Sequence, residues 1–298
     1  MSQFRNKKEA VIVRTIQFSG YSSILFVLLI LYFLLAEGLP ALTTVPLNSI
    51  FSTRWYPIEN YFGILPLISG TLVVTLGATL VAVPLGVGTA IFLSEVAPDW
   101  VKEIFKPLIE ILAGIPSVVL GFIGILVIAP FLRRFLDLPT GLTAFTGSIL
   151  LGIIAIPTIV SIAEDALNNV PPAYRQASFA LGATRWQTIW GVTLPAARSG
   201  VITAVMLGVG RAMGETMTVM MVTGNAPVMP ESLNILFSPV RTMTATIASE
   251  MGEVATGSSH YAVLFFIGIV LFIFSLIVNV IASSIGYRRQ NRQERLLS

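Results

Sequence analysis

Two charged residues, Arg211 and Glu215, interrupt an otherwise uncharged stretch at residues 199–223. A charged side chain near the centre of a membrane helix costs about 2.5 to 3.5 kcal/mol on insertion scales, so such residues pair or face a water-filled cavity. At about 1.5 Å per residue, Arg211 lies roughly 18 Å into the stretch, slightly beyond the membrane midplane. Arg placed four residues before Glu is the weaker order for a helical ion pair. The two residues therefore indicate a role beyond mutual pairing.

The chemistry that suits these residues is recognition of an oxyanion. A guanidinium donates paired hydrogen bonds in a fixed plane and stays charged at any relevant pH. Ionised Glu215 repels an anion unless the anion carries a proton, as hydrogen phosphate does and sulfate near neutral pH does not. Spacing of three and four residues gives the helix one small or polar face, made of Ala204, Gly208, Arg211, Glu215, Thr218 and Val222. We predict a substrate pathway with Arg211, Glu215 and Thr218; the alternative is an interhelical lock with another subunit.

The composition indicates a membrane protein, with 55% hydrophobic and 11% charged residues and a mean hydropathy of +0.85. A bilayer core needs about 20 apolar residues per helix. Six stretches qualify, at residues 18–36, 63–93, 111–132, 140–163, 199–223 and 261–285. We therefore expect an all-α bundle of six transmembrane helices. The second stretch contains Pro66 and Pro84, so its helix is expected to span residues 67–92 and to kink or break near a proline.

Basic residues predict the orientation of the bundle. Thirteen Lys and Arg residues fall in the two terminal segments and in the loops after the second and fourth stretches, against four in the other loops. The positive-inside rule then places both termini in the cytoplasm, although Arg133 and Arg134 oppose the trend. The expected organisation is a cytoplasmic tail (1–17), a first helix (18–36), a core (63–285) with a cytoplasmic loop (164–198) and an external loop (224–260), and a second cytoplasmic tail (286–298). A signal peptide is the alternative for the first helix.

The loop at residues 164–198 has the pattern of two helices joined by a glycine turn. Pro171 and Pro172 can open a helix, and Gly182 is a natural left-handed cap at its end. Thr184 and Gln187 form a capping box that starts a second helix, which is expected to stop before Leu194 and Pro195. A short, rigidly supported helix suits docking in a groove of another protein. The alternative is an amphipathic helix lying on the membrane.

This loop resembles the coupling loop of permease subunits of bacterial ABC importers, whose pattern is Glu-Ala-Ala, three residues, Gly, and a later Leu-Pro. The matching residues are Arg175, Gln176, Ala177, Ser178, Gly182, Ala183, Thr184, Leu194 and Pro195. Gln176 stands in place of Glu and Ser178 in place of the second Ala, so the salt bridge of that Glu is not expected. The resemblance implies a type I importer permease fold in the bacterial inner membrane, with this loop seated in an ATP-binding subunit.

The run from Gly210 to Val219, with Gly224-Asn225-Ala226-Pro227 and the run from Ile115 to Gly121, is similar to the phosphate-specific branch of that family. This resemblance implies a second homologous permease, two ATP-binding subunits and an extracytoplasmic phosphate-binding protein as partners. No Lys follows a Gly, so the chain lacks a P-loop and we expect ATP and Mg²⁺ on the partner subunits.

With no Cys and a single His, His260, the chain is expected to be no enzyme and to hold no metal or cofactor. The basic residues are explained by membrane topology, so we expect lipid contact and no nucleic-acid partner. The alternative functions are a permease for another oxyanion and an ion-coupled secondary anion transporter or channel.

Overall fold

The computed structural model describes the backbone of residues 2–229 and 233–297, with side chains described for residues 12–229 and 235–281. Residues 1 and 298 of the expected tails and 230–232 of the expected external loop lie outside the described residues. Six helical segments are long and apolar enough to cross a membrane: Ile12–Thr44, Leu65–Val96, Ser117–Phe135, Ala144–Asn168, Arg185–Gly214 and Ser259–Ile281. The expected all-α, six-span bundle is confirmed.

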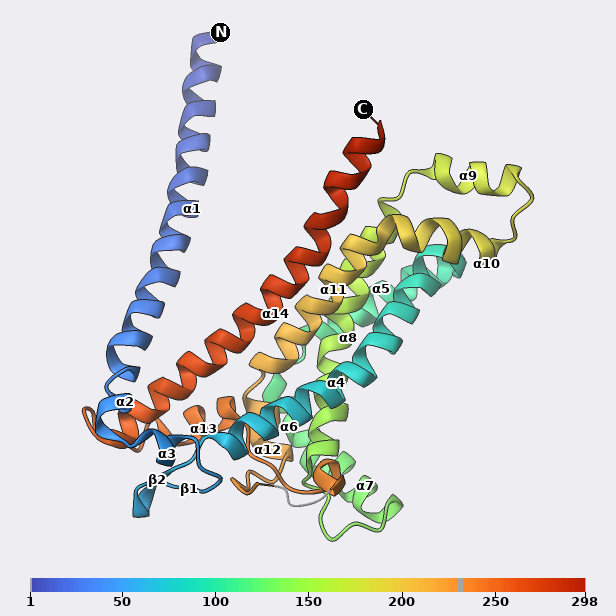
Figure 1. The fold of residues 1–298 in the computed structure, drawn as a ribbon. Coiled ribbons are helices and arrows are strands. Elements are labelled where there is room, and N and C mark those ends of the chain that lie inside the picture. Colours follow the sequence, from blue (N-terminus) through green and yellow to red (C-terminus); the bar gives the residue numbers. More distant parts are fainter. Residues whose placement is uncertain (1, 230–232, 298) are drawn as a thin grey trace.

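Helix α1 (Ser2–Gly38) projects away from the rest of the molecule, and only its C-terminal end lies beside α14 (Ser259–Leu297) (Figure 1). Short elements follow it at that end: α2 (Ala41–Thr44), α3 (Leu47–Ile50), β1 (Trp55–Tyr56), the 3-10 turn η1 (Pro57–Glu59) and β2 (Tyr61–Phe62). The two strands pair antiparallel, with Trp55 opposite Phe62. Both side chains are buried against α14, which fixes this end of the first span.

The centre of the bundle is α8 (Ala144–Asn168), packed between α4 (Leu65–Ile91) and α11 (Leu194–Gly214). Small residues permit this close packing, because apolar lipid supplies no hydrophobic force between helices and van der Waals contact must hold them together. Gly86 of α4 and Gly208 of α11 both press on Ile159 of α8, where a Cβ added at Gly86 would lie 2.7 Å from the Ile159 side chain. Ile159 is fully buried.

Prolines act differently in the second and third spans. Helix α4 begins at Leu65, passes through Pro84 without a break and ends in the π-helical turn η2 (Phe92–Val96), so the expected break is absent there. The expected third span, 111–132, is divided: α5 (Asp99–Gly114) ends before Pro116, and the span begins at Ser117 with α6 (Ser117–Ile123), the π turn η3 (Gly124–Ile128) and α7 (Ala129–Phe135). Ile115 is extended (φ −66°, ψ 126°), the conformation favoured before proline.

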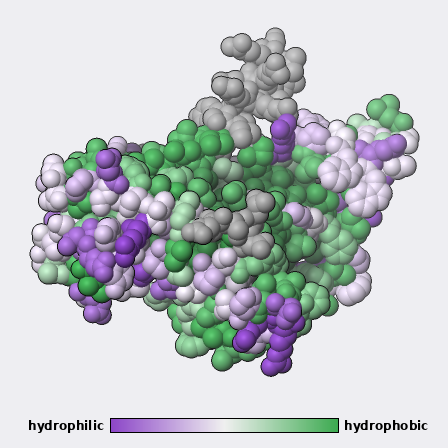
Figure 2. All heavy atoms as spheres, turned by 60° about the horizontal axis from the view of Figure 1, so that its bottom comes forward, coloured by the Kyte–Doolittle hydropathy of each residue, from purple (hydrophilic) through white to green (hydrophobic). Residues whose placement is uncertain are grey.

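The start of α1 and the end of α14 lie at the same end of the molecule as α9 (Pro172–Ala180) and α10 (Arg185–Thr188) (Figure 1). The opposite end carries α12 (Met217–Val222), the 3-10 turn η5 (Leu233–Phe237), α13 (Met243–Glu250) and the hairpin. Figure 2, in which this opposite end comes forward, shows hydrophilic residues gathered at its outer edges with apolar surface between them. The two terminal helix ends and the α9–α10 loop thus share one end of the molecule, as expected, and the segment after α12 lies at the other. Which end faces the cytoplasm stays a prediction.

Candidate functional site

The fifth span is broken at Glu215. Helix α11 ends at Gly214, Glu215 is extended (φ −67°, ψ 133°), and α12 begins at Met217. The prediction of one continuous helical face through Arg211, Glu215 and Thr218 was therefore wrong. Glu215 instead turns its carboxylate to the start of α12, where Oε1 accepts hydrogen bonds from the backbone N–H groups of Thr216 (3.2 Å) and Thr218 (3.5 Å). The side chain thus satisfies backbone donors that a helix start leaves free.

Arg211 is an exposed side chain near the end of α11, and it is held from α8. Its Nη1 donates to Oγ1 of Thr158 at 2.9 Å. No ion pair joins Arg211 to Glu215, both of which lie in the described part of the chain. The guanidinium charge is consequently oriented by a neutral hydroxyl, and no carboxylate of the described residues pairs with it. The sequence did not predict Thr158 as the partner of Arg211. The one local signal was Pro157, which precedes it inside an apolar span.

Thr218 lies at a junction between two broken helices. It is fully buried, and its Oγ1 donates to the Ser117 carbonyl at 2.8 Å, at the start of α6. Thr244 of α13 donates in turn to the Glu215 backbone carbonyl at 3.0 Å. The break of the third span thus meets the break of the fifth span, and α13 is hydrogen-bonded to the latter. Thr218 therefore secures this junction, while Arg211 presents the exposed charge.

The loop between the fourth and fifth spans has the expected helix, turn and helix. Helix α9 is followed by Gly182 in the left-handed conformation (φ +84°). The Thr184–Gln187 capping box is complete, because the Thr184 N–H donates to Gln187 Oε1 (2.8 Å) and the Gln187 N–H donates to Thr184 Oγ1 (3.3 Å). Gln176, Ala177, Gly182 and Thr184 are exposed, and Ala183 is half-buried.

Two boundaries of this loop differ from expectation. The loop was expected to begin at residue 164. Glu164 instead belongs to α8, which continues to Asn168, so the loop begins after Asn168. The second helix does not stop before Leu194 and Pro195. It passes through α10, the π turn η4 (Ile189–Thr193) and α11 as one span from Arg185 to Gly214. A π turn changes the local hydrogen-bond pattern, which lets a helix continue past a proline that cannot donate.

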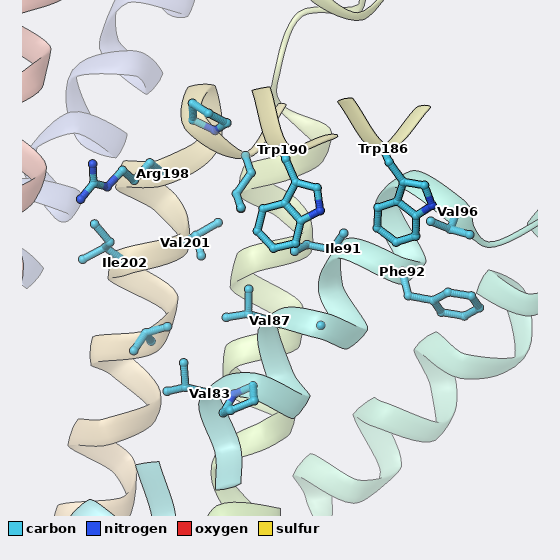
Figure 3. A pocket seen from close by; sticks show the side chains of 15 residues that line it. Val83, Val87, Ile91, Phe92, Val96, Trp186, Trp190, Arg198, Val201 and Ile202 are labelled. Atoms are coloured by element: carbon cyan, nitrogen blue, oxygen red, sulfur yellow. The ribbon is translucent and has the colours of Figure 1, made fainter. Parts of the chain in front are cut away.

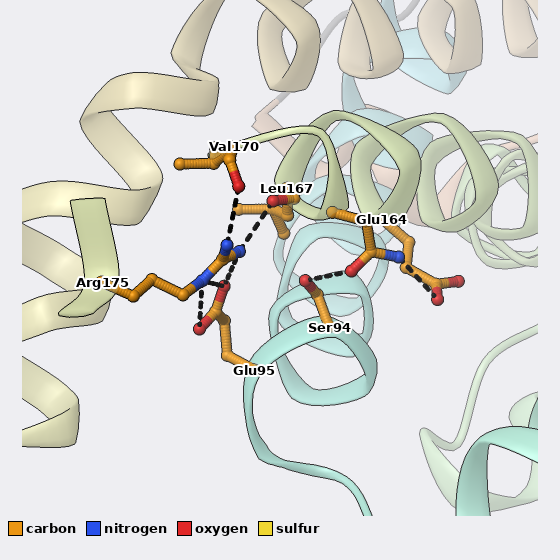
Figure 4. A network of polar contacts seen from close by, with 7 residues as sticks. Ser94, Glu95, Glu164, Leu167, Val170 and Arg175 are labelled. Atoms are coloured by element: carbon orange, nitrogen blue, oxygen red, sulfur yellow. Dashed lines mark hydrogen bonds and ion pairs between the residues drawn. The ribbon is translucent and has the colours of Figure 1, made fainter. Parts of the chain in front are cut away.

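Arg175 faces the bundle and joins the loop to η2, the π turn that ends the second span (Figure 4). Its Nη2 and Nε contact the Glu95 carboxylate at 2.6 and 3.0 Å, and its Nη1 and Nη2 donate to the carbonyls of Val170 and Leu167, both at 2.8 Å. The Glu95 side chain is only 7% exposed. This anchor was not foreseen, because Glu95 is distant in sequence.

A second network lies beside this anchor (Figure 4). Ser94 donates to Asn168 (2.8 Å), Asn168 donates to Glu164 (3.3 Å), and Lys106 pairs with Glu164 at 2.9 Å. The hydrogen bond to Glu164 raises the pKa of Lys106 against the lowering effect of burial. This network therefore joins η2, α5 and α8 to one another beside the Arg175 anchor of the loop.

The loop carries large apolar side chains on its outer surface. Ser178 is buried, and its hydroxyl lies 2.9 Å from that of Thr188, which holds α9 against α10. This contact gives a physical reason for Ser in place of Ala at position 178. Leu181, beside the turn, is 88% exposed, and Tyr174 and Phe179 are about half exposed. A hydrophobic tip on a braced support suits insertion into a groove of a partner protein.

A six-span bundle with a braced helix–turn–helix loop at one end defines a transport permease rather than an enzyme. The chain belongs to the family described as binding-protein-dependent transport system inner membrane component, whose family model matches residues 82–290. It is therefore a multi-pass inner membrane protein, and its family implies ATPase and binding-protein partners.

Similar proteins include the probable ABC transporter permease protein YqgH of Bacillus subtilis, 42% identical over 82% of this chain and 79% of that protein. The phosphate transport system permease protein PstC of Xylella fastidiosa (strain 9a5c) is 37% identical over 82% of this chain and 80% of that protein. The phosphate transport system permease protein PstC of Mesorhizobium japonicum is 36% identical over 84% of this chain and 81% of that protein.

Solved structures support the fold. An inward-facing MetNI methionine ABC transporter matches 75% of this chain and 93% of its own, with a TM-score of 0.55 and 19% identity. A bacterial ABC transporter involved in alginate import matches 89% of this chain and 95% of its own, with a TM-score of 0.57 and 16% identity. The type I importer permease fold is therefore confirmed.

Proposed function

We propose that this chain is the permease subunit of an ATP-driven importer of inorganic phosphate. The observation that carries the proposal is the similarity to phosphate transport permeases over more than four fifths of the chain, which includes Arg211 and the helix break at Glu215. An exposed guanidinium that pairs with no carboxylate among the described side chains suits a doubly charged oxyanion, because Arg donates in a planar fork and stays charged. Arg211 acts on the anion, and Glu215 and Thr218 shape the junction beside it.

The partners in this proposal are a homologous PstA-like permease, two PstB-like ATP-binding subunits and a PstS-like extracytoplasmic phosphate-binding protein. ATP and Mg²⁺ bind to the ATP-binding subunits, and both termini and the α9–α10 loop lie in the cytoplasm. The loop contacts the ATP-binding subunit through its apolar tip around Leu181 and Gly182. The family of this chain supports such an assembly.

The continuous fifth span supplies a mechanical route for coupling. Arg185, at the start of α10, and Arg211 lie on one uninterrupted helix of the span Arg185–Gly214, separated by roughly 39 Å at 1.5 Å per residue. A displacement of the loop on ATP binding is delivered along this helix to Arg211 and to the break at Glu215. The Arg175–Glu95 ion pair carries the same displacement to α4.

The alternatives are weaker than this proposal. A secondary transporter has no use for a braced loop with an exposed hydrophobic tip. A permease for another oxyanion is less favoured, because relatives that match more than four fifths of this chain are named as phosphate transport permeases. These arguments favour phosphate and an ATPase partner.

The experiment is ATP hydrolysis by the complex reconstituted in liposomes with its binding protein. Phosphate should stimulate hydrolysis several-fold, and sulfate or molybdate at the same concentration should not. Stimulation by sulfate in place of phosphate would contradict the substrate. Failure of the chain to purify with any ATP-binding subunit would contradict the importer itself.

A further inference from the structure

An apolar groove runs between α4 and α11 at the end of the bundle that carries α9. The groove has a volume of about 810 Å³. Figure 3 shows Val83, Val87 and Ile91 along one wall and Val201 and Ile202 along the other, with the rings of Trp186 and Trp190 at the mouth. Both tryptophan side chains are about 60% exposed.

The groove is separate from the anion site. Among the described residues that line it, Arg198 alone is charged, and it lies thirteen residues before Arg211 on the same helix. At 3.6 residues per turn, the two side chains point about 140° apart around α11. Arg211 turns toward α8, whereas the groove opens on the α4 side. Apart from Arg198 and the two indole N–H groups, the described side chains that line the groove carry no hydrogen-bonding group, so its interior suits an apolar ligand.

The mouth of the groove has the chemistry of a membrane interface. Tryptophan concentrates where hydrocarbon meets headgroups, because its ring is apolar and its N–H is polar. Arg198 is exposed at the groove edge and makes no ion pair with any residue in the described part of the chain. Basic pockets between membrane helices on the cytoplasmic side bind anionic lipid headgroups. A cation at the edge, aromatic rings at the mouth and apolar walls below match one lipid molecule.

We propose that this groove holds an acyl chain of an anionic phospholipid, with the lipid phosphate bound by Arg198. From Val83 to Ile91 the wall extends roughly 12 Å along α4, close to the ~15 Å depth of one leaflet of the hydrocarbon core. No carboxylate lines the groove in the described part of the chain, so Arg198 is available for the phosphate of a lipid headgroup. Lipid therefore fits the groove.

The test is quenching of tryptophan fluorescence by brominated lipids in the assembled complex, placed in phosphatidylcholine nanodiscs. Trp186 and Trp190 are the reporters, and subtracting the signal of the W186F/W190F complex isolates them. Brominated phosphatidylglycerol should reach half-maximal quenching at about fivefold lower mole fraction than brominated phosphatidylcholine with the same acyl chains. One basic residue attracts an anionic lipid by about 1 kcal/mol, which corresponds to a ratio of about five in affinity.

Three variants connect the signal to the groove. Arg198→Gln should make the two lipids equal, while Arg134→Gln, which removes the same charge at the opposite end of the bundle, should keep the preference. Gly88→Leu should weaken quenching by both lipids, because open space surrounds an added Cβ there and a larger side chain fills the groove. Equal quenching by the two lipids in the unmodified complex would overturn the proposal, and so would a preference that survives Arg198→Gln. The proposal would also fail if neither lipid quenched the two tryptophans because the second permease covers them.

Discussion

Arg211 and Glu215 are four residues apart in sequence and do different work in the structure. Arg211 is oriented by the Thr158 hydroxyl, so its charge stays available. Glu215 uses Oε1 to accept from the backbone of α12, and its own carbonyl accepts from Thr244. An ion pair between them would have consumed the charge that an anion needs. The separation by a helix break is therefore consistent with a pathway role for Arg211.

Glu250, at the end opposite α9, is the residue whose environment predicts a pH dependence. Burial would raise its pKa, but hydrogen bonds from His260 (2.8 Å) and Trp55 (3.2 Å) and the charge of Arg241 outweigh burial and lower the pKa below its ordinary value of 4.5. A carboxyl whose pKa falls on folding stabilises the protein above its unfolded pKa, and this contribution is lost as the pH drops through the lower folded value.

We expect the Tm of the purified complex to fall by a few degrees as the pH decreases from 6 to below 4.5. Glu250→Gln should lower the Tm at pH 6 and flatten this part of the profile, because the neutral amide cannot titrate. Glu59→Gln, an exposed carboxyl of the same region, is the control. An unchanged slope in Glu250→Gln would exclude Glu250 as the source.

At the scale of elements, the turn between α9 and α10 depends on its backbone conformation. Gly182 has φ +84°, and no heavy atom lies within 4 Å of a Cβ built there, so a substitution meets strain and no steric clash. Gly182→Val should uncouple ATP hydrolysis from transport, since a β-branched residue at positive φ costs about 1 to 3 kcal/mol. Gly182→Asn should retain coupling, because Asn tolerates this conformation.

The measurement is the ratio of phosphate transported to ATP hydrolysed in proteoliposomes. A normal ratio in Gly182→Val, with the ATP-binding subunits still attached, would show that the shape of the turn is unimportant for coupling.

The Arg175–Glu95 pair is the contact that holds this loop on the bundle. Removing one partner of a buried ion pair costs about 3 to 5 kcal/mol, since the other charge is left without compensation. Arg175→Met should therefore lower the Tm of the complex by roughly 6 °C or more. Arg185→Met, an exposed cation of the same loop, should change the Tm little. Equal effects of the two substitutions would mean that the pair contributes nothing specific.

The elements that sequence predicted well are those with local signals. The capping box and the glycine turn need only neighbouring residues, and six apolar stretches suffice for six spans. Sequence did not distinguish Pro84, which α4 accommodates, from Pro116, which ends a helix, because the outcome depends on packing and on the preceding backbone. The break at Glu215 was missed because Gly214 and Thr216 are common in membrane helices. Contacts between distant residues, such as Thr158 with Arg211, leave no periodic signal.

At the scale of the whole molecule, the two ends of the bundle should lie on opposite sides of the membrane. The chain has no native Cys, so single Cys residues can report each side. In intact cells stripped of any outer barrier, an impermeant maleimide should label Ile58→Cys, which is 86% exposed near β1. Arg185→Cys, in the α9–α10 loop, should label only after the membrane is opened. The reverse pattern would invert the topology.

The whole complex is predicted to move phosphate past Arg211, and uptake of radioactive phosphate by membranes containing Arg211→Gln tests this most directly. Gln keeps hydrogen-bond donors but lacks the charge that offsets the loss of water around the anion. We predict at least tenfold lower uptake, with the complex recovered from membranes in normal amount and with Arg134→Gln transporting normally. Normal uptake by Arg211→Gln, or a loss of assembly that Arg211→Gln/Glu215→Gln restores together with uptake, would contradict the account and make Arg211 a structural lock.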